Sequence, residues 1–394
     1  MNDLIDLLLT NGEKPAHLSV LRREVELHTA ALRASAGRGN RGQVARAEEV
    51  VCSSPAAAFA FDSDGFATLS AAGHRWQAGR FETLSIGALR ERTRRKRSGA
   101  TTPQVRLWVF DGASPVTDIG SLQAGGGAST LYQVASQFNC LESPGPSVTS
   151  VANYFSDGTQ GPRASISAFP ATLLRHYGAP GADGERFVQT TDGHQIDLLR
   201  DACGPGVVRN GYFTGEGIDD RKALATALES RFEAIRVGVH DGAQVVLGYN
   251  WDGAVADAEK RGIAQVFTST VAGGGYGGER HLGTSAFVAA CRQLLRAAYL
   301  GTLLAAADLG RTRVVLTLIG GGVFHNPILL IWEAILWAIE EVRPFLSGNL
   351  EVIVNGYSDL GRLIDLGKLV LPAVRDRGGA ILSFDHTGLT RIRR

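Results

Sequence analysis

The sequence predicts a three-layer α/β fold: a mixed, mostly parallel sheet with helices on both faces, preceded by a small N-terminal α+β segment. The last third of the chain alternates apolar strands with long helices, and glycine-rich turns follow two of those strands. At 394 residues the chain is also too long for one small core. We therefore expect an N-terminal cap or extension over 1–100. The main domain would cover 101–394, with an insertion around 144–260.

The N-terminal segment is expected to begin as helix and to continue as short strands. Leucine and valine recur at helical spacing through 1–36, and the run AGRGNRGQ at 36–43 interrupts that pattern. Asp-Ser-Asp-Gly at 62–65 then separates two apolar runs, which predicts a β-hairpin.

The main domain is expected to begin with a buried strand at 105–113. A second hairpin is predicted over 235–251, because His-Asp-Gly-Ala at 240–243 lies between two apolar runs. The remaining elements alternate as strand 263–272, helix 285–310, strand 311–320, helix 328–346 and strand 350–357. Right-handed crossovers between such strands produce a parallel sheet that is covered on both faces.

Glycine gathers in three clusters, at 125–127, 273–278 and 320–327. A backbone without Cβ atoms can approach a phosphate closely, and the N–H groups that open the next helix point at it. Two of the clusters directly follow predicted parallel strands. We therefore expect one pocket built from several strand ends.

Several common enzyme classes do not fit. Gly273, Gly275 and Gly278 satisfy G-x-G-x-x-G, but the following strand ends LTLIGGG, without the acid that holds a ribose in nicotinamide-dependent dehydrogenases. The P-loop motif and the G-x-S-x-G motif of serine hydrolases are both missing. His281 and His325 have no partner at metal-ligand spacing, so neither a metal nor a cofactor is expected.

The net charge and the cysteine content indicate which partners the protein binds and in which cellular compartment it works. A net charge of +1 favours neither nucleic acid nor an anionic membrane as a direct partner. The four cysteines are isolated, which suits a reducing compartment. The N-terminus lacks the basic start of a secretory signal, and the apolar stretch 328–339 is too short to span a bilayer. A cytoplasmic protein without membrane contact is expected.

The turn at 320–327, GGGVFHNP, resembles the closing loop of macrodomains. The order of elements over 263–357 is most similar to the bacterial-type poly(ADP-ribose) glycohydrolases. In that family the loop wraps the diphosphate and distal ribose of ADP-ribose, and its aromatic residue packs against the ribose. The resemblance implies ligand contacts from Gly320, Gly321, Gly322, Val323, Phe324 and Asn326.

The same family carries a GGG loop followed by a Gln-Glu-Glu signature, one Glu of which protonates the departing ribosyl oxygen. Here Gly125, Gly126 and Gly127 precede SQFNCLE at 136–142. The resemblance implies that Gly125–Gly127 hold the ribose, that Glu142 is the acid, and that Gln137 and Asn139 bind ribose hydroxyls. The spacing is longer than in the family, and one acid stands where two are usual. Core packing of Phe138, Cys140 and Leu141 is the alternative explanation of this run.

The run NYFSDGTQGPR at 153–163 is expected to form a further wall of the pocket. Asp157, Thr159, Gln160 and Gly161 would lie near the ligand and Arg163 near a phosphate, whereas a surface loop is the alternative. The resemblance implies that a SQFNCLE-like run followed by a TQGP-like run is typical of a distinct branch of macrodomain-like proteins. The candidates for the adenine amine are Asp111 and Asp118. Those for stacking are Tyr276, Phe267 and Tyr357, of which we take Tyr276 as the ligand-binding residue.

The resemblance implies that the protein binds ADP-ribose and hydrolyses an ADP-ribosyl linkage on a protein, a nucleic acid or a small conjugate. Nucleic acid would then be a partner only as a modified substrate. A carboxyl group suits the reaction because the leaving oxygen must be protonated as the oxocarbenium-like transition state forms. The alternatives are a module that binds ADP-ribose without turnover, which the missing second acid favours, and a module for a related nucleotide such as NAD.

Overall fold

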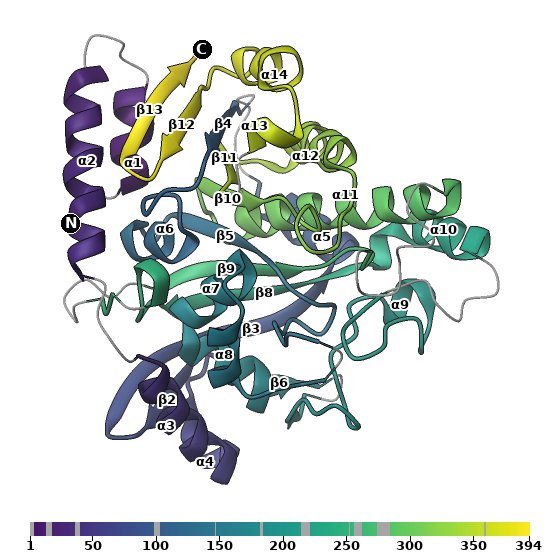
Figure 1. Cartoon of the computed structure of the whole chain (residues 1–394). Coiled ribbons are helices and arrows are strands. Elements are labelled where there is room, and N and C mark those ends of the chain that lie inside the picture. Colours follow the sequence, from purple (N-terminus) through teal and green to yellow (C-terminus); the bar gives the residue numbers. More distant parts are fainter. Residues whose placement is uncertain are drawn as a thin grey trace.

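The structure is a computed structural model (Figure 1). It describes residues 4–12, 18–35, 40–97, 103–145, 147–181, 184–213, 221–251, 253–255, 262–273, 284–357 and 360–394.

The strands are β1 (Phe59–Phe61), β2 (Ala67–Ala71), β3 (His74–Ser85), β4 (Val105–Asp111), β5 (Thr130–Ala135), β6 (Ala179–Pro180), β7 (Arg186–Phe187), β8 (Arg236–Gln244), β9 (Gly262–Thr268), β10 (Arg313–Thr317), β11 (Leu350–Gly356), β12 (Ile381–Asp385) and β13 (Gly388–Arg393). The α-helices are α1 (Leu4–Gly12), α2 (Leu18–Ser35), α3 (Asn40–Ser53), α4 (Pro55–Ala58), α5 (Ile86–Lys96), α6 (Ile119–Gly125), α7 (Gln160–Ser167), α8 (Phe169–Tyr177), α9 (Arg200–Cys203), α10 (Arg221–Ser230), α11 (Ser285–Asp308), α12 (Ile328–Val342), α13 (Leu360–Leu363) and α14 (Leu371–Arg375). Short helical turns are η2 (Val151–Ser156), η3 (Phe232–Ala234), η4 (Tyr249–Trp251), η8 (Arg343–Phe345) and η9 (Leu366–Val370).

Eleven of the described strands form one sheet, in the order β1-β2-β3-β8-β9-β5-β10-β11-β4-β12-β13. The six strands from β9 to β12 in that order run parallel, and the strands at the two ends join antiparallel. Strands β9, β10 and β11 alternate along the chain with α11 and α12, as predicted. The mixed α/β fold with a large sheet flanked by helices is therefore confirmed.

Two neighbouring residues of β5 show how the helices cover the two faces of the sheet. Side chains of successive strand residues point to opposite faces. The Tyr132 hydroxyl donates to Leu122 O of α6 (2.6 Å), and the Gln133 amide donates to Thr302 of α11 (2.9 Å). Helices α6 and α7 therefore lie on one face and α11 on the other (Figure 1).

The N-terminal segment extends this same sheet. The predicted hairpin at 62–65 is present: β1 and β2 are antiparallel, and Asp62 Oδ1 accepts the N–H groups of Asp64 (3.0 Å) and Phe66 (2.9 Å). Strand β3 then pairs with β8 of the main domain over six residue pairs, from Arg80↔Asp241 to Ser85↔Arg236. The domain boundary near residue 100 stays a prediction. The pairing of β3 with β8 joins the N-terminal segment and the main domain in one hydrogen-bonded sheet.

The second predicted hairpin, over 235–251, is wrong. Residues 236–244 form one continuous strand, β8, between β3 and β9. Gly242 has φ +71°, and the register to β9 shifts between His240 and Ala243. The chain therefore makes a β-bulge where the sequence suggested a turn, because a glycine with positive φ serves both.

Among the described residues, no helix has both the length and the apolar character that crossing a membrane requires.

Candidate functional site

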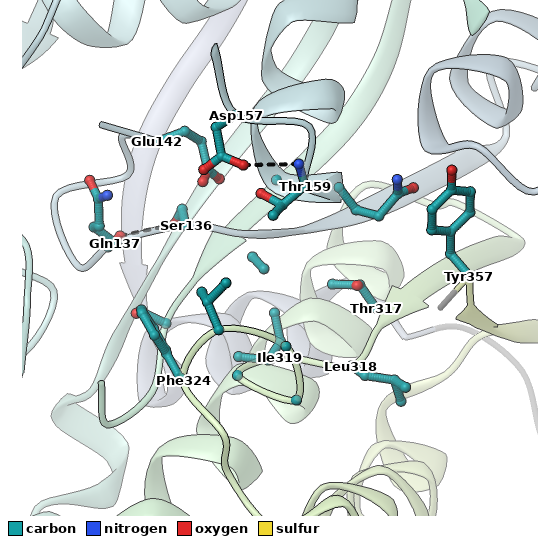
Figure 2. A pocket seen from close by; sticks show the side chains of 18 of the residues that line it. Ser136, Gln137, Glu142, Asp157, Thr159, Thr317, Leu318, Ile319, Phe324 and Tyr357 are labelled. Atoms are coloured by element: carbon teal, nitrogen blue, oxygen red, sulfur yellow. Dashed lines mark hydrogen bonds between the residues drawn. The ribbon is translucent and has the colours of Figure 1, made fainter. Parts of the chain in front are cut away.

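A cavity of about 320 Å³ opens at the carboxyl ends of three neighbouring parallel strands, β5, β10 and β11. Ligands of α/β proteins bind at this edge, and the volume is at the lower end of the range for small-molecule sites. Figure 2 shows Glu142 and Asp157 on one wall, Phe324 and Ile319 on the facing wall, and Tyr357 at one end. The lining residues are Ala135, Ser136, Gln137, Glu142, Ser143, Pro144, Asp157, Gly158, Thr159, Gln160, Gly161, Tyr212, Ser269, Thr317, Leu318, Ile319, Gly320, Gly321, Gly322, Val323, Phe324, Asn355, Gly356, Tyr357 and Leu363.

Glu142 reaches the cavity through a tight turn that follows β5. Cys140 has φ +62°, its N–H donates to Gln137 O (2.9 Å), and Gln137 N–H donates to Leu141 O (3.0 Å). The Glu142 N–H donates to the hydroxyl oxygen of Tyr154 (2.8 Å), which comes from η2. The backbone of Glu142 is thus fixed by one hydrogen bond to a buried side chain.

The carboxyl group of Glu142 is held in an apolar setting. The side chain lines the cavity but is only 7% exposed, and within the described part of the chain its Oε1 has no hydrogen-bond partner. Burial raises the pKa of Glu142 well above its usual range; the charge of Arg175 acts against this, and the nearby Asp157 adds to it. Burial therefore favours the neutral form of the Glu142 carboxyl group.

Behind the turn lies a buried cation, Arg175 of α8. Its guanidinium donates to Cys140 O (3.1 Å) and to Thr172 (3.1 Å), contacts His240 Nδ1 (3.2 Å) and stacks on the Phe267 ring at 3.7 Å. Burial lowers the pKa of Arg175 to about 10. The guanidinium thus holds the carbonyl group of the positive-φ residue Cys140, and its charge acts on Glu142.

A second acid, Asp157, faces the cavity beside Glu142 (Figure 2). Its Oδ1 accepts the Thr159 N–H (2.9 Å) ahead of α7. Glycine is needed at the second position of α7, since a Cβ on Gly161 would lie 2.6 Å from Glu142 Oε2 and would also overlap Ala135 O. Asp157, Thr159, Gln160 and Gly161 all line the cavity, where the sequence places them.

The facing wall is the turn between β10 and α12. Gly320 has φ +72°, and a Cβ there would lie 2.5 Å from Thr270 Cγ2, so only glycine fits. Gly320, Gly321, Gly322, Val323 and Phe324 line the cavity as expected, and the Phe324 ring meets Tyr212 edge-on at 6.2 Å. In the described structure no hydrogen bond uses the N–H groups of Gly322 and Val323, so both can serve a ligand.

Asn326 is placed differently from the expectation. Its side chain is 4% exposed and donates to Val271 O (3.1 Å), and its N–H donates to Gly320 O (3.0 Å). It closes the turn from outside the cavity and does not line it.

Of the two amides predicted to bind ribose hydroxyls, only Gln137 lines the cavity. Its Nε2 donates to Tyr212 (2.8 Å) and to Ser143 O, so it holds the cavity wall together. Asn139 turns away: its Nδ2 donates to Gln195 (3.0 Å), and its Oδ1 accepts the Leu141 N–H (3.0 Å). The expectation that Asn139 contacts the ligand therefore does not match its position.

The glycine run Gly125, Gly126 and Gly127 lies at the wrong edge of the sheet for the predicted role. It ends α6 and precedes β5, whereas the cavity follows β5. A Cβ on Gly126 would overlap the Tyr132 hydroxyl, which donates to Leu122 O. These glycines thus permit close packing of α6 against the sheet, and none of the three lines the cavity.

The residues predicted to contact the adenine lie in different places in the structure. Tyr357 lines the cavity, whereas Phe267 is buried in the core and Tyr276 lies outside the described residues. Asp118 caps α6 and pairs with Arg163 (2.5 Å), and Asp111 accepts the Gly361 N–H (2.9 Å). The Arg163 guanidinium is thus held by Asp118 and is not directed at a phosphate.

Several lining residues carry no signal in the sequence. Tyr212 lies in the polar stretch after residue 144, and Asn355 is the last residue but one of β11, in the run Asn-Gly-Tyr. Ser136, Ser269 and Thr317 lie at strand ends, and this position is the one pattern that could have identified them. Within the described ranges, no group of three or more histidine, cysteine or acidic side chains is arranged to hold a metal ion.

No protein-family model and no curated protein matches the chain. Among solved structures, the chain is similar to poly(ADP-ribose) glycohydrolase from Thermomonospora curvata, with 14% identity and a TM-score of 0.43 over 86% of this chain and 100% of that chain. It is also similar to poly(ADP-ribose) glycohydrolase from Deinococcus radiodurans in complex with ADP-ribose, with 14% identity and a TM-score of 0.36 over 75% of this chain and 93% of that chain.

Proposed function

We propose that the cavity binds ADP-ribose or the ADP-ribosyl group of a conjugate, and that the protein hydrolyses an ADP-ribosyl linkage with Glu142 as the general acid. One observation carries the proposal: a buried carboxyl group with a raised pKa lies in the cavity wall opposite the glycine-rich turn.

The state of Glu142 suits the acid role. Cleavage of the glycosidic bond leaves negative charge on the departing oxygen, and a neutral carboxyl group can protonate it as the bond breaks. An ionised Glu142 would keep a buried Oε1 without a hydrogen-bond partner in the described structure, which burial disfavours. Asp157 on the same wall discourages ionisation further. The proton is thus retained until a ligand offers an acceptor.

The facing wall suits a sugar diphosphate. No lysine or arginine is among the described residues that line the cavity, so backbone N–H groups would supply most of the phosphate contacts. The N–H groups of Gly322 and Val323 are available, and nothing lies within 4 Å of a Cβ built on Gly322. The Phe324 and Tyr212 rings offer an apolar surface against which a ribose can pack.

The test measures release of ADP-ribose from an ADP-ribosylated protein, an ADP-ribosylated oligonucleotide and a small ADP-ribosyl conjugate. Glu142→Gln should lower kcat by about 10²–10⁴, the range for loss of a general acid. It should leave the Kd for ADP-ribose, measured by calorimetry, within a few fold, because glutamine matches the neutral acid in shape and charge. Glu24→Gln, an exposed change on α2, is the matched control.

The outcomes separate the alternatives. Full activity of Glu142→Gln would rule out Glu142 as the acid. Tight ADP-ribose binding without release from any conjugate would identify a non-catalytic binding module, and a preference for NAD would identify a different nucleotide ligand. A ligand at 100 times its Kd stabilises the fold by about 2.7 kcal/mol. The absence of any thermal shift with ADP-ribose-containing compounds would refute the proposal as a whole.

A further inference from the structure

A buried carboxylate in the N-terminal segment, Glu48 of α3, makes three hydrogen bonds on the far side of the cavity wall. Its Oε1 accepts the Val151 N–H (2.5 Å) and the Tyr177 hydroxyl (2.8 Å), and its Oε2 accepts the Ala152 N–H (2.9 Å). The side chain is 4% exposed. All three partners lie outside the segment that contains Glu48.

Two of those partners open the short helix η2. The first N–H groups of a helix have no partner within the helix, and the Ser150 side chain, at the capping position of η2, does not bond to them. Glu48 satisfies two of these N–H groups and so takes the place of a local cap. Its third partner, Tyr177, ends α8, so Glu48 also ties η2 to α8.

Helix η2 carries two groups toward Glu142. The Tyr154 hydroxyl accepts the Glu142 N–H (2.8 Å) and is also hydrogen-bonded to His176 Nε2 (2.7 Å). Burial lowers the pKa of His176 to about 3, so the ring that holds the Tyr154 hydroxyl is neutral. At the other end of η2, the N–H of Asp157 donates to Tyr154 O (3.1 Å), and the Asp157 side chain enters the cavity.

We propose that Glu48 is a positioning residue for the cavity: by holding the start of η2, it sets the position of Tyr154 and through it the backbone of Glu142. The role of the N-terminal segment follows from this. The segment completes the cavity wall through one carboxylate more than 90 residues away in the chain from Glu142. The effect on turnover rests on the proposed function, whereas the effect on the Glu142 backbone does not.

The test compares Glu48→Gln with Val51→Ala. Glutamine keeps the shape but replaces one acceptor oxygen by an N–H₂ group, which faces a donor. Val51 lies on the same helix and in the same apolar cluster as Val151 and Tyr154, is fully buried, and makes no side-chain hydrogen bond. Val51→Ala should therefore destabilise the segment without releasing η2.

The first readout is native-state hydrogen exchange at the Glu142 amide. Because Tyr154 protects that N–H, Glu48→Gln should speed its exchange by about tenfold relative to Val51→Ala at matched global stability. Equal protection of the Glu142 amide in the two variants would overturn the proposal. This readout needs no substrate.

The second readout is turnover, in a cycle with Tyr154→Phe. If Glu48 acts through Tyr154, each single change should lower kcat by about tenfold or more, and the double variant should lose little beyond that. If the two single losses of kcat instead multiply in the double variant, Glu48 does not act through Tyr154, and that outcome would overturn this route. If the exchange result holds but no variant releases ADP-ribose, the positioning role stands and the proposed function fails.

Discussion

Replacing Gly161 by alanine tests how closely α7 approaches β5 and Glu142 in the cavity wall. At an ordinary position in a helix, this change stabilises a protein by about 1 kcal/mol. Here the new Cβ would lie 2.4 Å from the backbone oxygen of Ala135 and 2.6 Å from Glu142 Oε2, whereas ordinary contacts begin near 3.4 Å. Because the Ala135 oxygen belongs to the backbone of β5, a shift of the carboxyl group alone does not relieve the overlap. Helix α7 must move away from β5 by about 1 Å and the carboxyl group must shift as well, and overpacking of this kind costs about 1–3 kcal/mol.

The expected result is a variant less stable than the parent by about 1–2 kcal/mol in urea unfolding, since the overlap outweighs the gain in helix propensity. Displacement of an acid by nearly 1 Å should also lower kcat by about 10². Gly42→Ala is the control, because it lies in α3 and its Cβ would meet only the flexible end of Arg46 at 3.4 Å. Gly42→Ala should leave the free energy of unfolding unchanged or raise it. A Gly161→Ala variant with unchanged stability and kcat would refute the reasoning.

Two further predictions concern the charge of Glu142. Its pKa is raised in the folded state, so its contribution to stability is present at low pH and is lost as pH rises from its unfolded pKa toward the folded one. In urea unfolding, Glu142→Gln should therefore gain stability relative to the parent as the pH rises above the unfolded-state pKa of a glutamate, and an unchanged difference would contradict the raised pKa. Asp157 helps to raise that pKa, and Asp157→Asn keeps the acceptor for the Thr159 N–H while removing the charge. The fall of kcat/KM with increasing pH should then move to lower pH; a shift in the opposite direction would show that Asp157 does not act on Glu142 by its charge.

The parallel part of the fold could be predicted because its signals are local and repeated. Strands β9, β10 and β11 are apolar runs separated by long helices, and each contains its own pattern. The turn at 62–65 was also predictable, since the Asp62 side chain stabilises it without distant partners. By contrast, Gly242 permits either a turn or a bulge, and pairing with both β3 and β9 selected the bulge.

The cavity was predictable where a residue follows a strand end, and less so elsewhere. Glu142 and Phe324 lie on the two walls as expected. Gly126 shows the limit of glycine patterns, because the same residue type accommodates a packed tyrosine hydroxyl as well as a ligand. The proximity of Asp157 to Glu142 depends on the path of η2, and no spacing along the chain reveals it.

The pairing of β3 with β8 also limits how this chain can be shortened. A chain that began near residue 101 would lose β3, and β8 would become an edge strand with its backbone N–H and C=O groups open along six residue pairs. Such an edge pairs readily with a second molecule, so self-association is the expected failure. Inactivity of such a shortened chain would then reflect self-association rather than a change in the chemistry of the cavity.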